Sequence, residues 1–187
     1  MSHLRILGNP TLMIDNLKSV INNRVMFILL PGPYIKELED KIETFKNKDI
    51  CYSSVNDFWV MEEKILSKIN KKLDIVICAA KECNVPSLKH VEFLNRPKRN
   101  LFVTEEVSFH TNLETFKREY TDRLFFFTAD RSEKALSRPD RDYPLNFLAQ
   151  ASFSILVCLG IIGQAKSIYL FGADGGRIGK ELYYEGW

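Results

Sequence analysis

Two short glycine-containing segments carry residue types that can bind an anionic ligand. In Leu30-Pro31-Gly32-Pro33-Tyr34, a glycine follows a continuous apolar run and precedes a helical pattern. The N–H groups of a first helical turn, together with the helix dipole, attract an anion such as phosphate. Gly32 would let the ligand approach the backbone, although a plain strand-to-helix turn uses the same residues. The segment is not a Walker A loop, because it lacks the GK[ST] ending.

The second segment is Gly172-Ala173-Asp174-Gly175-Gly176, which ends another apolar run. A carboxylate at Asp174 can bind ribose hydroxyls, a metal ion or a substrate donor. Gly172 and Gly175 let the chain turn away and let a ligand approach. The hydroxyls of Tyr183 and Tyr184, further along, are able to donate to phosphate. A glycine-rich turn followed by an edge strand is the alternative.

A third polar segment, Ser53-Ser54-Val55-Asn56-Asp57, follows an apolar run near the middle of the first half. The Asn56 amide both donates and accepts hydrogen bonds, which suits contact with a base or a ribose. Helix capping by the same residues is the alternative, and the local pattern favours it.

Composition narrows the class of protein. The 187 residues carry a net charge of +2, which does not indicate a nucleic-acid partner. Three scattered histidines and four cysteines without a CxxC pair predict reduced core thiols and no metal site. We find no signal-peptide pattern and no apolar segment of the roughly 20 residues that a membrane span needs. A cytoplasmic protein is expected.

Short apolar runs alternate with amphipathic helical patterns, as in βαβ units. We expect a single Rossmann-like α/β domain over residues 1–187, truncated at the C-terminus in one interpretation. Its sheet should be doubly wound and mostly parallel, with helices on both faces. The expected strands are 25–30, 50–53, 75–79, 101–104, 124–127 and 167–171. The expected helices are 35–45, 58–69, 113–120 and 145–162, with a long loop at 129–144. Ligands of such sheets bind outside the carboxyl ends of the strands, here at 31–34 and 172–184.

Two of these segments carry a family resemblance. Phe27–Tyr34 resembles the GxGPSL strand-loop-helix of the MptE-like (motility accessory factor) proteins. ASFSILVCLGIIGQAKSIYLFGADG, residues 151–175, resembles their later signature, in which a small-residue helix start leads to an IYLxGxD strand. The related Rossmann-like bacterial sialyltransferases (nonulosonate transferases) show a similar layout, including a segment like Val55–Phe58. The likeness spans roughly Val25 to Tyr184.

The resemblance implies a nucleotide-dependent transferase that moves a sialic-type sugar from a CMP-activated donor to a sugar or glycan acceptor. Such an enzyme would hold no tightly bound cofactor and no metal. An ATP-dependent hydroxymethylpterin diphosphokinase, which would need Mg²⁺, is one alternative. A nucleotide- or sugar-binding module without catalysis is another.

Residue by residue, the resemblance implies two groups of site residues. Gly32 and Pro33 would lie beside the nucleotide phosphates, and Asn56 would contact the nucleotide. The nucleotide side would also include the small-residue turn at Ala151 and Ser152. The catalytic residues would be Asp174, which closes the site from the last strand, and Tyr183, which reaches the leaving phosphate.

The sequence departs from the family pattern at several places. Tyr34 stands where the family has serine, and Ala79 or Ala80 stands where the sialyltransferases have asparagine. Gly176 falls near the first of two phosphate-binding tyrosines, and the histidine expected as a base is not in this chain. These departures favour a fragment, a different chemistry or a protein that binds without turnover.

Overall fold

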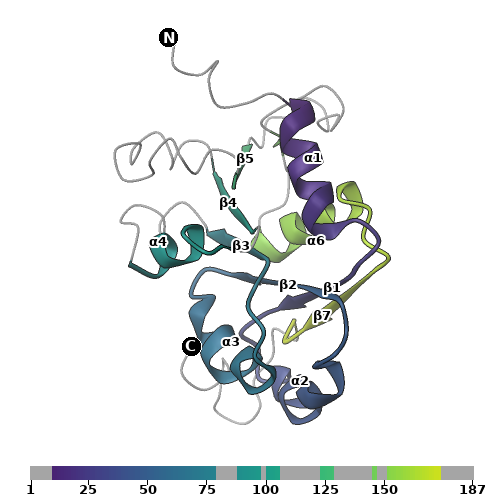
Figure 1. Ribbon diagram of the computed structural model, residues 1–187, viewed down its shortest axis with the longest axis vertical. Helices are drawn as coiled ribbons and strands as arrows, with labels where there is room; N and C mark the ends of the chain where they lie inside the picture. Colours follow the sequence, from purple (N-terminus) through teal and green to yellow (C-terminus); the bar gives the residue numbers. More distant parts are fainter. Residues whose placement is uncertain are drawn as a thin grey trace.

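The computed structural model describes residues 10–78, 88–97, 100–105, 123–128, 145–146 and 151–173. Its centre is a seven-stranded sheet in the order β6-β5-β4-β3-β2-β1-β7, and every neighbouring pair is parallel (Figure 1). The strands are β1 (Val25–Leu29), β2 (Ile50–Val55), β3 (Ile75–Cys78), β4 (Leu101–Glu105), β5 (Leu124–Thr128), β6 (Leu145–Asn146) and β7 (Ser167–Phe171). This confirms the predicted α/β fold with a parallel sheet.

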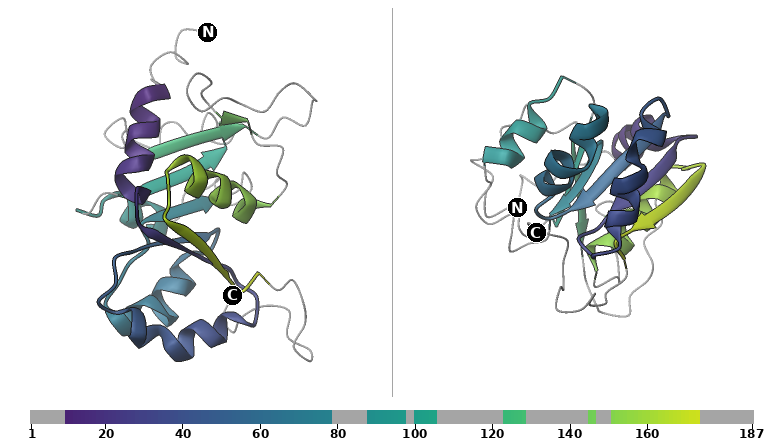
Figure 2. Two further views of the ribbon diagram at one scale, coloured as in Figure 1. Left: turned by 90° about the vertical axis from the view of Figure 1, so that its right-hand side faces the viewer. Right: turned by 90° about the horizontal axis from the view of Figure 1, so that it is seen from below.

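Helices cover both faces of the sheet, which Figure 2 shows from two further directions. The helices are α1 (Pro10–Ile21), α2 (Ile35–Lys41), α3 (Trp59–Lys64), α4 (Leu88–Leu94) and α6 (Ser152–Ile162), with 3-10 turns η2 (Ile42–Phe45) and η3 (Leu66–Ile69). One buried cluster joins the sheet to α2, α3 and α4, and a second joins it to α1 and α6. The doubly wound arrangement predicted from the sequence is therefore present.

The apolar runs form strands because both of their faces are buried. In β1, Phe27 and Leu29 pack in the cluster under α2, whereas Met26 and Ile28 pack in the cluster under α6. A strand between two helical layers needs apolar side chains at every position, and the sequence therefore shows a continuous apolar run instead of alternation.

The strand order reverses beside β1. Strands β1 to β6 follow one another across the sheet, whereas β7 returns to the opposite side of β1. Helix α6 makes this return on the face opposite to α2, as right-handed crossovers in the two directions require. The β1–β7 boundary is therefore the place where doubly wound folds bind their ligands.

One predicted boundary was wrong and two helices were missed. Residues 145–146 are not helical, because they pair with β5 as the short strand β6, and α6 begins only at Ser152. Helix α1 was not predicted, although Met13, Leu17 and Ile21 recur at helical spacing and are buried. Helix α4 was also missed. The predicted helix 113–120 and the predicted loop 129–144 lie outside the described residues.

Within the described part of the chain, we find no helix that is both long and apolar enough to span a bilayer.

Candidate functional site

The residues that follow β1 and β7 are hydrogen-bonded to each other at the carboxyl edge of the sheet. The Leu30 N–H donates to the Phe171 carbonyl at 2.9 Å, and the Gly32 N–H donates to the Gly172 carbonyl at 3.0 Å. The start of the loop predicted at 172–184 is thus a neighbour in space of the loop predicted at 31–34, at the point where the strand order reverses. Residues 174–184 lie outside the described residues.

Gly172 is the residue that allows this close contact. Its φ is +71°, and a Cβ built on it would lie 2.2 Å from the Leu30 carbonyl oxygen and 3.0 Å from the Gly32 oxygen. Because a side chain has no room there and left-handed backbone favours glycine, only glycine fits this position without moving the loops.

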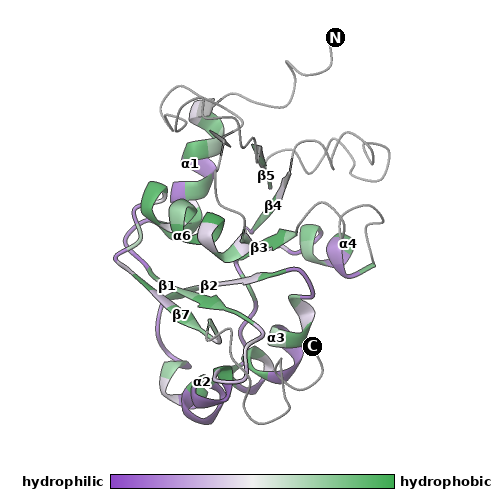
Figure 3. Cartoon of the chain, turned by 180° about the vertical axis from the view of Figure 1, so that it is seen from behind, coloured by the Kyte–Doolittle hydropathy of each residue, from purple (hydrophilic) through white to green (hydrophobic). Residues whose placement is uncertain are grey.

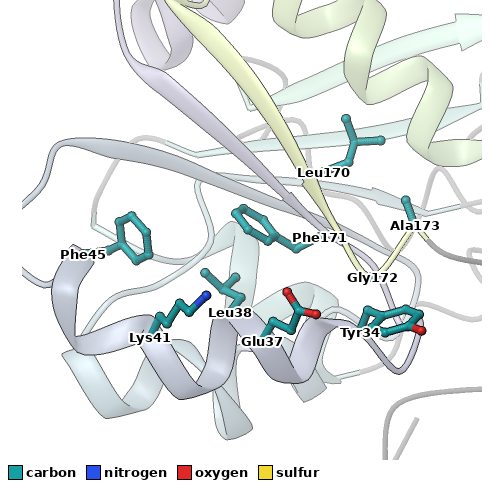
Figure 4. Close-up of a pocket in the computed structure, with 9 residues that line it drawn as sticks. All are labelled: Tyr34, Glu37, Leu38, Lys41, Phe45, Leu170, Phe171, Gly172 and Ala173. Carbon is teal, nitrogen blue, oxygen red and sulfur yellow. The ribbon is translucent and has the colours of Figure 1, made fainter. Parts of the chain in front are cut away.

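A pocket of about 340 Å³ opens between α2 and β7 beside these loops (Figure 4). Its size falls within the range of small-molecule sites, which are mostly apolar with a few polar groups. The lining residues are Tyr34, Glu37, Leu38, Lys41, Phe45, Leu170, Phe171, Gly172 and Ala173.

The inner wall of the pocket is aromatic. The rings of Phe45 and Phe171 flank the buried ring of Phe27, with centroids 5.1 Å and 4.8 Å from it. Phe45 and Phe171 are only partly buried, so each presents part of its ring to the pocket. Such a wall suits a flat ring, because aromatic rings favour stacked and edge-to-face contacts with one another.

Two charged side chains form the rim. Glu37 and Lys41 are exposed, lie one helical turn apart on α2, and point toward β7 (Figure 4). The Glu37 carboxylate can accept hydrogen bonds and the Lys41 ammonium group can donate them. An aromatic wall with one acceptor and one donor on its rim can bind a flat ring and form hydrogen bonds with the polar groups at the edge of that ring.

The start of α2 contributes side chains to this pocket but few free N–H groups. The N–H of Gly32 bonds to Gly172, that of Ile35 bonds to the Gly32 carbonyl, and that of Lys36 bonds to the Pro33 carbonyl. Gly32 and Pro33 are themselves buried. In this arrangement Gly32 and Pro33 shape the loop, and these N–H groups are already bonded within the chain.

Helix α6 brings a second N-terminus to the same edge of the sheet. It runs from the carboxyl end of β6 to the amino end of β7 and packs against β1, β2 and β3. Ala151 precedes it in extended conformation, without a side-chain cap, and Ala151 and Ser152 are half-buried. The positive end of the helix dipole therefore points toward the carboxyl edge of the sheet, and the residues at this helix start have small side chains.

Asn56 lies at the exit of β2, on the other side of the β1 loop from Gly172. It is half-buried with a φ of +44°, its N–H donates to the Ile77 carbonyl at 2.8 Å, and its carbonyl accepts from the Phe58 N–H at 2.7 Å. Asparagine tolerates this left-handed conformation better than most residues, and such strained positions concentrate at functional sites.

No family model and no curated protein matches this chain. The geometry of the pocket and the resemblance in the sequence are therefore the observations that bear on function. Asp174, Gly175 and Tyr183 lie outside the described residues. In the described part of the chain, no cluster of three or more His, Cys, Asp or Glu side chains is arranged to hold a metal ion.

The side chains of α2 and η2 that line the pocket were not predicted from the sequence. Glu37, Lys41 and Phe45 recur every four residues, which places them on one side of a helix. That spacing was a usable signal. It did not show that this side faces β7, because only the sheet order reveals that β7 lies next to β1.

A buried thiol–imidazole contact was also not predicted from the sequence. The Sγ atom of Cys78, at the end of β3, lies 3.5 Å from Nε2 of His90 in α4. Both side chains are buried, and the imidazole packs against the rings of Phe58 and Phe102. Burial lowers the pKa of His90, although the Asp57 carboxylate opposes the shift. The pair is enclosed by the core, away from the pocket.

Proposed function

We propose that the protein is a nucleotide-dependent transferase of glycosyltransferase type, with a CMP-activated sialic-type sugar as its donor. The observation that carries the proposal is the pocket between α2 and β7, beside the place where the strand order reverses. Architecture alone selects this place for a ligand. The resemblance to the MptE-like proteins and sialyltransferases adds the class of ligand.

The pocket fits the base of such a donor. A cytosine ring would lie against Phe45 and Phe171, with its amino group donating to Glu37 and its carbonyl oxygen accepting from Lys41. The negative charge of the phosphate would be stabilised at the same sheet edge, where Asn56 and the uncapped start of α6 at Ala151 and Ser152 lie. Catalysis would then consist of positioning the donor and stabilising the leaving phosphate.

Asp174 and Tyr183 remain the proposed catalytic residues. Asp174 directly follows Ala173 in the sequence, and Ala173 lines the pocket. We place the protein in the cytoplasm. The described cysteines Cys51, Cys78 and Cys158 carry thiols instead of disulfides, which fits a reducing compartment.

A thermal-shift titration tests the proposal. The purified chain is titrated with CMP, CDP, UDP and ATP, each with and without Mg²⁺. A ligand at a hundred times its Kd adds about 2.7 kcal/mol of stability. We expect CMP to stabilise the protein without Mg²⁺. The Lys41→Ala variant should weaken CMP binding about tenfold, or about 1.4 kcal/mol. Lys46→Ala, an exposed lysine outside the pocket lining, is the matched control.

The outcomes separate the alternatives. A response to ATP only in the presence of Mg²⁺ would favour the diphosphokinase. Stabilisation by CMP without release of CMP from an activated donor would favour a binding module. Absence of any response to the four nucleotides would contradict the proposal.

A further inference from the structure

Strand β7 forms one edge of the sheet in the described part of the chain, and its sequence lacks the residues that usually prevent another strand from pairing with an edge. Figure 1 shows β7 beside β1 at this end of the sheet. Its five residues, Ser-Ile-Tyr-Leu-Phe, include no charged residue and no proline. Proteins normally protect an edge strand with such residues, because unpaired backbone groups recruit another strand.

The register identifies the backbone groups at this open edge. The Phe171 carbonyl accepts from the Leu30 N–H, so the backbone groups of Phe171 face β1. Alternate residues of a strand point their backbone groups in opposite directions, and those of Ile168 and Leu170 therefore face outward. Among the described residues, these outward groups have no strand beside them.

Both faces of β7 carry exposed apolar side chains at the same edge. Tyr169 is 52% exposed on the α2 face, where its ring lies 5.7 Å from that of Phe27. Leu170 is 39% exposed on the α6 face. Among the described residues no strand covers the edge of β7, and both of its faces are apolar. A partner that pairs with this edge would therefore also bury side chains above and below the sheet.

Helix α6 extends this apolar surface. Its last turn contacts β7, since a Cβ added at Gly160 would lie 2.6 Å from Ile168 Cδ1. Phe153, Val157 and Ile161 recur every four residues on α6, and Phe153 and Ile161 are exposed. Figure 3 shows this helix coloured hydrophobic along most of its length.

We infer that β7 pairs with β7 of a second copy of this chain, forming a symmetric dimer with one continuous sheet. A two-fold axis at Tyr169 makes the two strands antiparallel. Ile168 of each copy then exchanges two backbone hydrogen bonds with Leu170 of the other copy. The two Tyr169 residues face each other as a non-hydrogen-bonded pair, with Cα atoms about 4.5 Å apart.

A second copy fits this surface because the surface is complementary to itself. The outward backbone groups are centred on Tyr169, so the same strand reversed meets every one of them. The four exposed side chains Phe153, Ile161, Tyr169 and Leu170 together offer about 400 Å² on each copy, taking about 200 Å² for a fully exposed large side chain. That is about half of the ~800 Å² per partner of a standard interface, before the strand backbones and flanking residues are counted.

Light scattering coupled to size-exclusion chromatography of the full chain at about 50 µM tests the inference. We expect a dimer. Leu170→Lys should give a monomer with unchanged helix and sheet content by circular dichroism, because charge on an edge strand opposes pairing. Leu88→Lys is the matched control, an 81% exposed leucine on α4 that should remain dimeric. A wild-type chain that is monomeric would overturn the inference, whichever segment covers the β7 edge. A dimer that persists in Leu170→Lys would also overturn it.

A second variant tests the position of the axis without loss of the fold. Tyr169→Cys places two thiols within disulfide range only if the strands pair as described. Mild oxidation should then yield a covalent dimer, whereas Leu88→Cys should yield none. A stable dimer in which Tyr169→Cys fails to crosslink would overturn the proposed interface. The inference does not depend on the proposed function, and neither readout involves a nucleotide.

Discussion

Substituting Gly172 by alanine should be the most damaging single-methyl change at the candidate site. The left-handed φ of +71° costs a non-glycine residue about 1–2 kcal/mol. The added Cβ would also lie 2.2 Å from a backbone oxygen that cannot rotate away, so the loops after β1 and β7 must separate. The hydrogen bond between the Gly32 N–H and the Gly172 carbonyl, worth about 1 kcal/mol, would then be lost. We expect a total loss of about 3 kcal/mol in the free energy of unfolding.

Urea unfolding followed by circular dichroism measures this loss, with Gly160→Ala as the matched control. A Cβ at Gly160 meets the flexible ends of Ile168 and Met26, at 2.6 Å and 2.9 Å, instead of backbone. Overpacking there costs about 1–2 kcal/mol, and replacing glycine by alanine within a helix recovers about 1 kcal/mol. We therefore expect a net change of at most about 1 kcal/mol. The role assigned to Gly172 is refuted if Gly172→Ala is no more destabilising than Gly160→Ala.

Three further predictions concern the core. The Tyr52 hydroxyl is buried and has no hydrogen-bond partner among the described residues, and burial raises its pKa to about 12. Tyr52→Phe should therefore leave stability unchanged or raise it by about 1 kcal/mol in urea unfolding, and a loss above about 1 kcal/mol would contradict this. Burial lowers the pKa of His90, so the unfolded chain takes up its proton first, and stability should fall as the pH drops below about 6.5. His90→Phe should show a shallower fall in urea midpoint between about pH 7.5 and 5; parallel curves would exclude this source. Arg96→Ala leaves the buried Glu62 carboxylate without its bidentate partner and should lower the free energy of unfolding by about 3 kcal/mol. Lys72 is exposed and lies 3.7 Å from the same carboxylate, so Lys72→Ala should cost less than about 1 kcal/mol. Equal losses in the two variants would refute the distinction.

Strands were predictable from the sequence wherever both faces of a strand are buried. The runs at 25–30 and 50–53 match β1 and β2 closely, because fully buried strands need uninterrupted apolar residues. The run at 167–171 also matches β7, although Tyr169 and Leu170 are exposed at the edge of the sheet. Leu145 and Asn146 were not predictable in this way. Their strand is two residues long, and only the pairing with β5 distinguishes it from the start of an apolar helix.

The candidate site was predictable in its place but not in its composition. Breaks after two apolar runs marked the loops at Gly32 and Gly172, and the rule for parallel sheets placed both loops at one edge. The sequence did not reveal that β7 pairs with β1. That pairing brings Phe171 opposite Phe45 and creates the pocket, so these side chains could not be selected from local patterns.

The position of β7 also has a consequence for the order in which the protein assembles. The strand that completes β1, and with it the pocket, is the last described strand of the chain, so the site depends on contacts between residues far apart in sequence. Such contacts slow folding, because the long intervening segment must be ordered first. During synthesis, β1 to β6 leave the ribosome before β7 exists. Until β7 is synthesised, β1 is the edge strand of the sheet, and its unpaired backbone groups can pair with another strand. In the finished protein, β7 occupies this edge and the pocket lies beside it.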